Sequence, residues 1–376
     1  MMAHDPAITR RVFRRRSTPE AASINMLPGE AQAGLRQFSV ERLTAYGLVY
    51  EDAAELLDRV AQGEGWQDAA SDMAAALPTS RDGYAPATAA DQMFRKAALL
   101  RAAQFMMIED TAQRCELFGQ AAQLYASASV LARDRIRFEC RGVDGAVLVG
   151  WRFPAEAPCA VAVVWGGIEG WAMDFAAMGV ELARRGIEVF LIDGPGQGET
   201  RLTYGLYFDD NWQSHWRLAI DHVCEQAGDL PLFIVGNSMG GCLVMNYAPG
   251  DPRICGIVSN GGPLRPPGLT GDLPSKLRKF VVFCGEADAP SVWGALDAGR
   301  ALANSRQPLL ILHGSADPLV TEAEVLEIAR MAGSEDVEVA IFSNGEHCLY
   351  NHTADKHDLV AEWIRQRSRW AQDQRS

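Results

Sequence analysis

The stretch Leu232-Phe233-Ile234-Val235-Gly236-Asn237-Ser238-Met239-Gly240-Gly241 joins an apolar strand, a G-x-S-x-G motif and the start of a helix. In such a motif the glycines permit a sharp turn that lifts the serine hydroxyl above the edge of a parallel sheet. The motif alone also occurs by chance, because glycine is common. The strand before it and a helix predicted over Cys242–Tyr247 make the match more specific. We therefore expect Ser238 at a strand-to-helix turn, as a candidate nucleophile.

Short apolar segments alternate with amphipathic ones from residue 134 onward. Strands are predicted at 135–140, 146–152, 160–165, 188–192, 232–235, 255–259, 309–312 and 337–342, and helices near 171–185, 210–227, 240–248, 320–332 and 354–370. Two hairpin-like strands followed by strand–helix units indicate an α/β fold with a mostly parallel eight-stranded sheet covered by helices on both faces. The Pro-rich stretch 263–304 is expected to hold loops or short helices. Ligands bind beyond the carboxyl ends of strands in such folds.

The residues before this sheet have a different composition, rich in Ala, Gln, Glu, Arg, Leu and Met. Apolar residues at helical spacing, interrupted by prolines and by the Gly63-Glu64-Gly65 turn, predict about five helices. We expect a basic flexible tail over 1–16, a helical cap domain over 17–132 and a catalytic domain over 133–376.

The charge balance excludes several classes of partner. Asp and Glu number 48 against 35 Lys and Arg, so the net charge of the 376 residues is −13. Nucleic acids and anionic membranes need a basic face, so we expect neither as a partner. The pair Arg10-Arg11 lacks the apolar segment of an export signal, and the eight cysteines form no C-x-x-C pair. These features predict a cytoplasmic protein with reduced thiols, and they leave a homodimer open.

A serine nucleophile needs a base, and the base needs a carboxylate that orients it. In a fold of this type the chain order is serine, acid, histidine, each in a loop that follows a strand. Asp317 follows the strand predicted at 309–312, and His347 follows the one at 337–342. Asp288 is an alternative acid, although it precedes the strand that should come before it. We expect Ser238, Asp317 and His347 to form a catalytic triad.

Acyl transfer also needs donors for the oxyanion on the substrate carbonyl, each worth about 3–4 kcal/mol. The backbone N–H of Met239, directly after the serine, is expected to supply one. The Gly166-Gly167 turn is expected to supply the other, from the N–H of Gly167 or Ile168, because glycines let the backbone approach closely. The chain has neither an H-E-x-x-H motif nor a Cys/His pair at ligand spacing, so the sequence predicts no metal and no cofactor.

These features resemble a group of α/β-hydrolases that includes the fermentation–respiration switch esterase, 2,6-dihydroxypseudooxynicotine hydrolase and fungal hydrolases that shorten polyketide chains. The matching residues are Gly166-Gly167, the D-G-P-G-Q-G-E motif at 193–199, Gly241, Ile311-Leu312-His313-Gly314 before Asp317, and His347-Cys348 with Asn351. The resemblance spans about 134–370 and implies an α/β-hydrolase fold behind a helical segment. It also implies Ser238 as nucleophile, Asp317 as orienting acid and His347 as base.

Members of this group cleave esters or the carbon–carbon bond of β-diketone-like ketones. The sequence differs from the C–C-cleaving members after Gly261-Gly262, where no carboxylate occurs before Asp272. We therefore expect a serine-type hydrolase acting on an ester or an activated ketone of a small apolar, aromatic or polyketide-like metabolite. An enzyme with the same triad that transfers or eliminates an acyl group is one alternative, and a non-catalytic binding protein is another.

The substrate is expected to bind between the helical cap and the sheet domain, because pockets often lie at domain interfaces. Candidate contacts are Glu169, Trp171 and Trp212. Glu169 could equally be a surface residue. The tryptophans, together with Trp165, Trp216 and Trp293, could equally serve in core packing.

Overall fold

The computed structural model describes residues 24–373 except 79–82, 270–274 and 286–287. Its centre is an eight-stranded sheet in the order β1-β2-β4-β3-β5-β6-β7-β8. β2 is antiparallel to β1 and β4, and the other neighbours are parallel. The strands are β1 (Ile136–Arg141), β2 (Val147–Phe153), β3 (Ala160–Trp165), β4 (Ile187–Asp193), β5 (Leu232–Asn237), β6 (Ile254–Asn260), β7 (Leu309–Gly314) and β8 (Val337–Phe342). The fold class predicted from the sequence is confirmed.

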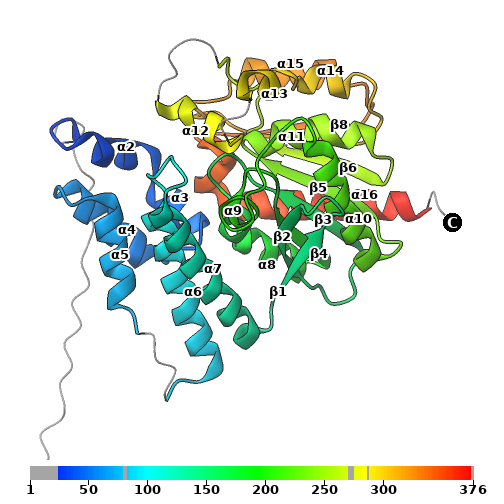
Figure 1. Cartoon of the computed structure of the whole chain (residues 1–376). Helices are drawn as coiled ribbons and strands as arrows, with labels where there is room; N and C mark the ends of the chain where they lie inside the picture. Colours follow the sequence, from blue (N-terminus) through cyan, green and yellow to red (C-terminus); the bar gives the residue numbers. More distant parts are fainter. Residues whose placement is uncertain (1–23, 79–82, 270–274, 286–287, 374–376) are drawn as a thin grey trace, which may run out of the picture.

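Helices cover both faces of this sheet (Figure 1). They are η1 (Ala172–Phe175), α8 (Ala176–Arg184), α9 (Gly198–Leu202), α10 (Trp212–Ala227), α11 (Met239–Tyr247), η2 (Ala248–Gly250), α12 (Ser275–Phe283), α13 (Ala289–Gly294), α14 (Ala298–Leu302), α15 (Glu322–Met331), η3 (His347–His352) and α16 (Thr353–Asp373). α8 and α16 pack on one face, and α10, α11 and α15 pack on the other. No helix among the described residues is long and apolar enough to span a membrane.

The central strands are apolar on both sides because successive side chains enter different layers. In β5, Ile234 packs in the layer of α10 and α11, whereas Phe233 and Val235 pack in the layer of α8 and α16. This double burial explains why the parallel strands are continuous apolar runs in the sequence. It also leaves the strand ends as the places where polar side chains gather.

Six helices precede the sheet in the described part of residues 29–132. They are α2 (Gly29–Gln37), α3 (Val40–Ala45), α4 (Tyr50–Ala61), α5 (Trp66–Ala76), α6 (Pro86–Ala103) and α7 (Ala112–Ala132). The short α3 begins at Val40 because Ser39 Oγ accepts the N–H of Arg42. The predicted boundary at 132/133 falls between α7 and β1, and the tail predicted over 1–16 lies outside the described residues.

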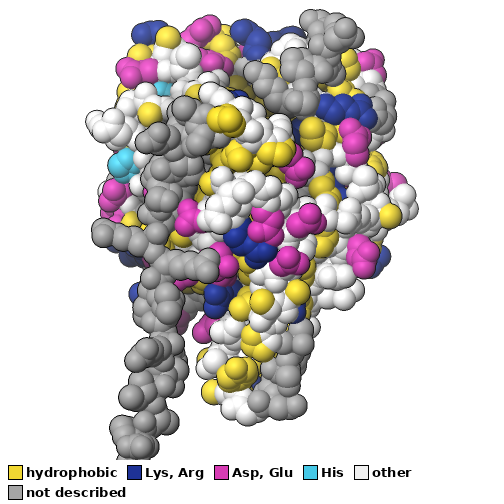
Figure 2. Space-filling model, turned by 90° about the vertical axis from the view of Figure 1, so that its left-hand side faces the viewer, with side chains coloured by type: hydrophobic (Ala, Val, Ile, Leu, Met, Phe, Trp, Pro, Cys, Tyr) yellow, Lys and Arg dark blue, Asp and Glu magenta, His cyan; other side chains and the backbone are white. Residues whose placement is uncertain are grey.

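These six helices, called the helical segment below, share an apolar cluster of their own and lie beside the sheet and its helices (Figure 1). Acidic, basic and hydrophobic side chains are interspersed on the face of the molecule that this segment forms (Figure 2). α7 also packs into the layer of α8 and α16, through Phe118 and Tyr125. The segment is therefore attached to the sheet by apolar packing.

A buried ion pair adds to this attachment. Arg101 of α6 donates through Nε to Asp174 Oδ1 at 3.0 Å and through Nη2 to the carbonyl of Tyr46 at 2.6 Å. Asp174 Oδ2 accepts the N–H of Trp171 at 2.9 Å. Arg101 and Asp174 are each 2% exposed. Burial raises the pKa of Asp174 even though the charge of Arg101 opposes this, so the carboxylate depends on its partner.

Arg101→Met should destabilise the protein, because it leaves the Asp174 carboxylate buried without a cation. Losing one partner of a buried pair costs about 3–5 kcal/mol, measurable as the free energy of unfolding in urea. Arg101→Met/Asp174→Asn should recover part of this loss, since Asn accepts the Trp171 N–H without charge. Arg59→Met, which breaks the more exposed pair with Glu64, should cost no more than about 1 kcal/mol. Equal losses for the two Arg→Met variants would contradict the interpretation.

Candidate active site

Ser238 lies at the turn between β5 and α11. Its backbone angles are φ 56° and ψ −128°, a conformation that costs a residue with a Cβ about 1–3 kcal/mol. The neighbouring glycines allow the turn to close. A Cβ at Gly236 would lie 2.2 Å from the carbonyl oxygen of Gly240, and a Cβ at Gly240 would lie 2.3 Å from that of Gly166. The glycines of the motif are thus needed for space.

Three side chains from separate strand ends form a hydrogen-bonded chain. Ser238 Oγ lies 2.8 Å from His347 Nε2, and His347 Nδ1 lies 2.8 Å from Asp317 Oδ2. Asp317 Oδ1 accepts the backbone N–H groups of Leu319 at 2.8 Å and Val320 at 3.2 Å. Because the carboxylate is an acceptor, Nδ1 of the neutral ring holds the proton and Nε2 is free to accept one from the serine. The structure therefore brings together the three residues that the sequence singled out.

Asp288, the alternative acid, lies elsewhere. It is the N-cap of α13, where its carboxylate accepts the N–H of Ser291 at 3.3 Å. Asp317 rather than Asp288 contacts the histidine. Burial works against ionisation of Asp317, but the hydrogen bonds from His347 and the backbone outweigh it and lower its pKa. The carboxylate is thus kept charged beside the ring.

The Gly166-Gly167 turn lies against the serine. A Cβ at Gly167 would lie 2.9 Å from Ser238 Cβ and 3.3 Å from its Oγ. The N–H of Gly167 donates to the carbonyl of Gly170 at 2.9 Å, whereas that of Ile168 makes no hydrogen bond within the described chain. Met239 begins α11, so its N–H has no partner inside the helix. Of the two candidates on this turn, the geometry favours Ile168 over Gly167.

Gln197 was not identified from the sequence, yet it holds this turn in place. Its Nε2 donates to the carbonyls of Gly166 at 2.8 Å and Gly167 at 2.9 Å, and its Oε1 accepts the N–H of Gly194 at 2.9 Å. The side chain is fully buried. Asp193 fastens the same loop by accepting the N–H groups of Ala172 and Glu199. Both residues belong to the D-G-P-G-Q-G-E motif at 193–199, which was the sequence feature that could have identified them. Their side chains stabilise the turn beside the serine.

A cavity of about 490 Å³ has Ser238 and His347 in its wall. Such a volume suits a small-molecule ligand. Its apolar lining, called the apolar wall below, includes Pro263, Pro267, Leu277, Phe280, Leu319 and Val320. Hydrogen bonds to Glu169 join Gln37, Arg42 and Lys279 into a polar wall. Since Gln37 comes from α2, Arg42 from α3 and Tyr46 from the C-cap of α3, the helical segment and the sheet domain both form the cavity.

Two more charged residues of the cavity wall were missed at the sequence level. Glu324 of α15 lines the cavity, and its Oε1 accepts the N–H of Leu264 at 2.7 Å. A carboxylate therefore lies beside the loop after Gly262 although none was visible in the sequence there. Arg265 also lines the cavity and pairs with Asp297 at 2.8 Å. Asp272 lies outside the described residues.

Among the described residues that line the cavity, neither Trp171 nor Trp212 occurs. Trp171 is 3% exposed and packs edge-on against Phe118, and Trp212 is 5% exposed and stacks on Phe208. The three other tryptophans considered as possible contacts, Trp165, Trp216 and Trp293, are buried as well. Their large apolar rings fill the layers between sheet and helices, so the expected contact between tryptophan and substrate is not supported. Glu169, in contrast, does line the cavity.

The chain is similar to several known hydrolases. Residues 156–286 match the family described as serine aminopeptidase, S33. The 2,6-dihydropseudooxynicotine hydrolase of Paenarthrobacter nicotinovorans is 27% identical over 274 residues, which are 70% of this chain and 72% of that protein. The hydrolase LUC6 of a Fusarium species is 36% identical over 86 residues, which are 21% of this chain and 20% of that protein.

Two solved structures have a similar fold over most of this chain. The crystal structure of 2,6-dihydroxy-pseudo-oxynicotine hydrolase matches with a TM-score of 0.74 at 20% identity, over 87% of this chain and 95% of that one. AbyA5 matches with a TM-score of 0.63 at 19% identity, over 82% of this chain and 92% of that one. These coverages extend beyond the sheet domain, so part of the helical segment is common to the three folds.

Gln197→Met should impair turnover without unfolding the protein, because it removes the donor that fixes the Gly166-Gly167 turn. We expect kcat for a p-nitrophenyl ester to fall about 10- to 100-fold, less than the loss of a whole oxyanion donor, with KM within about threefold. Gln213→Met, at an exposed position of α10, is the matched control. Thermal unfolding should show both variants folded. An unchanged kcat would refute the positioning role.

Proposed function

We propose that this chain, an α/β-hydrolase with a helical segment ahead of its sheet, is a serine hydrolase that cleaves an ester or the carbon–carbon bond of an activated ketone. The supporting observation is the hydrogen-bonded chain from Asp317 through His347 to Ser238, in the wall of a ligand-sized cavity. The names of the relatives support a hydrolytic reaction. The substrate is decided by the residues around the cavity and not by the fold.

In the first half-reaction, Ser238 Oγ bonds to the substrate carbonyl carbon while His347 Nε2 accepts its proton. The carbonyl oxygen becomes an oxyanion, stabilised by the N–H groups of Met239 and Ile168. Asp317 stabilises the imidazolium without taking its proton. Collapse of the intermediate breaks the bond to the leaving group, which receives the proton from His347. An acyl group then remains on Ser238.

In the second half-reaction, water attacks the acyl carbon and His347 accepts a proton from it. The ester bond to Ser238 breaks, the serine regains its proton and the acid is released. One oxygen of that acid therefore comes from solvent. A ketone follows the same route when its leaving carbon is stabilised as an enolate, which is then protonated. An elimination with His347 as base would instead leave an alkene, and it would make no use of the oxyanion donors.

Turnover of a p-nitrophenyl ester in ¹⁸O-labelled water should place one label in the released acid, as mass spectrometry can show. A fluorophosphonate probe should label Ser238. Ser238→Ala should lose that labelling and lower kcat by roughly 10³-fold or more. Ser214→Ala, at an exposed position of α10, is the control and should match the wild type. Activity retained in Ser238→Ala would contradict the nucleophile. With the natural substrate, an unlabelled acid and a new carbon–carbon double bond would establish elimination instead.

The pH dependence should reflect the environment of His347. Burial favours the neutral ring. The charge and hydrogen-bond interactions of the ring with Cys348 and with the Asp317 carboxylate outweigh burial and raise the pKa of His347 above its ordinary 6.5. Because the base acts only when neutral, kcat/KM should rise with pH along a limb centred above pH 6.5. Cys348→Ala should shift that limb to lower pH, whereas Cys115→Ala on α7 should leave it in place. A wild-type limb below pH 6.5 would contradict this assignment.

A further inference from the structure

We propose that Lys279 and Arg42 form a recognition site for a carboxylate on the substrate, at the polar wall of the cavity that contains Ser238. This inference rests on the proposed function, because it names a substrate class for the same cavity. It assigns to α12 and to the helical segment a role in choosing the substrate. Three features of this wall suit it to a carboxylate: its hydrogen bonds, its charge balance and its position.

The hydrogen bonds leave donors available on Lys279. Glu169 Oε2 accepts from Gln37 Nε2 at 2.5 Å and from Arg42 Nη2 at 3.1 Å, and its Oε1 accepts from Lys279 Nζ. The ammonium has three N–H donors, and the described residues supply it with this single acceptor. Arg42 Nε is buried and has no partner within the described chain. Glu169, in contrast, is already engaged by three donors, so an incoming acceptor suits this wall better than an incoming donor.

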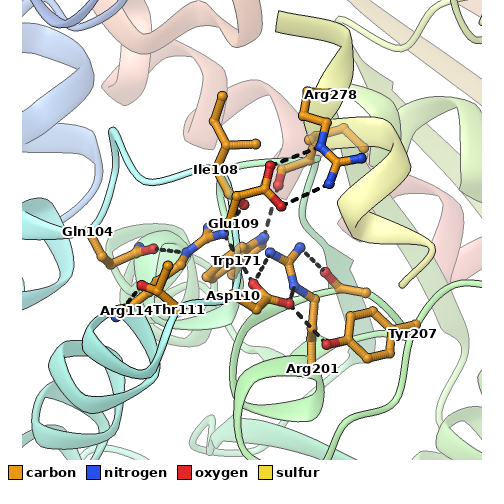
Figure 3. A network of polar contacts seen from close by, with 12 residues as sticks. Gln104, Ile108, Glu109, Asp110, Thr111, Arg114, Trp171, Arg201, Tyr207 and Arg278 are labelled. Atoms are coloured by element: carbon orange, nitrogen blue, oxygen red, sulfur yellow. Dashed lines mark hydrogen bonds and ion pairs between the residues drawn. The ribbon is translucent and has the colours of Figure 1, made fainter. Parts of the chain in front are cut away.

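The carboxylates do not balance the cations in this region. Next to the wall lies a small cavity of about 20 Å³, lined by Glu169 and Lys279 together with Arg114 and Arg201. Those two arginines share one carboxylate: Asp110 accepts from Arg201 Nη2 at 2.7 Å and from Arg114 Nη1 at 3.3 Å (Figure 3).

Four cations thus share two carboxylates: the cations are Arg42, Lys279, Arg114 and Arg201, and the carboxylates are Glu169 and Asp110. The neighbouring pairs, Glu109 with Arg278 and Arg101 with Asp174, are each balanced. This excess of positive charge occurs in a chain whose net charge is −13.

The excess of positive charge and the burial of the site act together on the pKa values of two of these cations. Burial, with the charges of Arg42 and Arg114, lowers the pKa of Lys279 to about 8. Burial, with the charge of Arg201, lowers the pKa of Arg114 to about 9. In both cases burial is the largest cause, and the neighbouring positive charges act in the same direction. A carboxylate bound at Lys279 would supply that charge in a largely buried site, where charge-assisted hydrogen bonds are strong.

The position of the wall suits a substrate with two functional ends. Glu169 directly follows Ile168, the candidate oxyanion donor, so the polar wall begins beside the reacting carbonyl. The apolar residues Leu277 and Phe280 come from the same helix as Lys279. A substrate could place its carbonyl at Ser238, its carbon skeleton along the apolar wall and its carboxylate at Lys279. The other two charged residues that line the cavity, Arg265 and Glu324, already have partners.

A series of p-nitrophenyl monoesters of dicarboxylic acids, from glutarate to suberate, tests this inference against the isosteric terminal amides. The wild type should prefer the best acid over its amide by about tenfold or more in kcat/KM, after correction for spontaneous hydrolysis. Lys279→Met should abolish that preference, mainly through KM for the acid. Glu169→Gln should increase it, because it removes a competing carboxylate. Lys96→Met is the matched control: Lys96 lies on α6 and donates to the carbonyl of Leu77, so this variant should keep the preference for the acid.

The outcomes separate this inference from the proposed function. Hydrolysis of acids and amides at equal kcat/KM would refute the carboxylate site, but it would not contradict the proposed serine hydrolase activity. If neither series were hydrolysed and the fluorophosphonate failed to label Ser238, the proposed function would fall. In that case, calorimetric titration of Ser238→Ala with suberate and with its monoamide would still test the site. Tighter binding of suberate that disappears with Lys279→Met supports it, and equal binding overturns it.

Discussion

The close contact between two backbone turns, one after β3 and one after β5, is the constraint on which the site depends. Gly240 and Gly167 have no room for a Cβ, because the facing turn lies within 3 Å of where it would be. This contact fixes Ser238 relative to the N–H groups of Met239 and Ile168. Gln197 then prevents the first turn from rotating, since it binds both glycine carbonyls. The two proposed oxyanion donors are thus held in position before any substrate binds, which is the condition for effective electrostatic stabilisation.

The parallel sheet supplies the remaining geometry. β5, β7 and β8 are parallel, and only β6 separates β5 from β7. The loops that hold the serine, the acid and the histidine therefore meet at the same edge of the sheet. Asn260, at the end of β6, ties these loops together: its Nδ2 donates to Asn237 Oδ1 at 2.8 Å and to the carbonyl of Cys348 at 3.0 Å. The serine and histidine loops are therefore fixed to the same strand. The distance of 2.8 Å between Ser238 Oγ and His347 Nε2 is thus supported by the buried amides of Asn237 and Asn260 as well as by the hydrogen bond itself.

Local features were predictable from the sequence, and contacts between distant segments were not. The strands and the turn at Ser238 follow from apolar runs and glycine spacing, and Asp317 and His347 follow from chain order. The role of Gln197 could not be inferred, because its partners precede it by about thirty residues in another loop. Trp171 and Trp212 were expected at the cavity because of their size and position near strand ends. Apolar size is equally suited to packing, and the periodicity does not say which neighbour a ring contacts.

The chemistry and the specificity of this molecule depend on different parts of the chain. The proposed reacting groups lie in loops that follow strands of the sheet, where buried strands and hydrogen-bonded turns leave little freedom. The polar wall combines Glu169, which follows β3, and Lys279 of α12 with residues of α2 and α3. These last two helices reach the cavity only because the helical segment packs against the sheet. Substitutions on those helices can alter which substrates fit without moving the serine or the histidine. A change in how the segment packs would also move Arg42 relative to Ser238. We therefore expect the contacts of α6 and α7 with the sheet domain to influence substrate selection, although no described residue of these two helices lines the cavity.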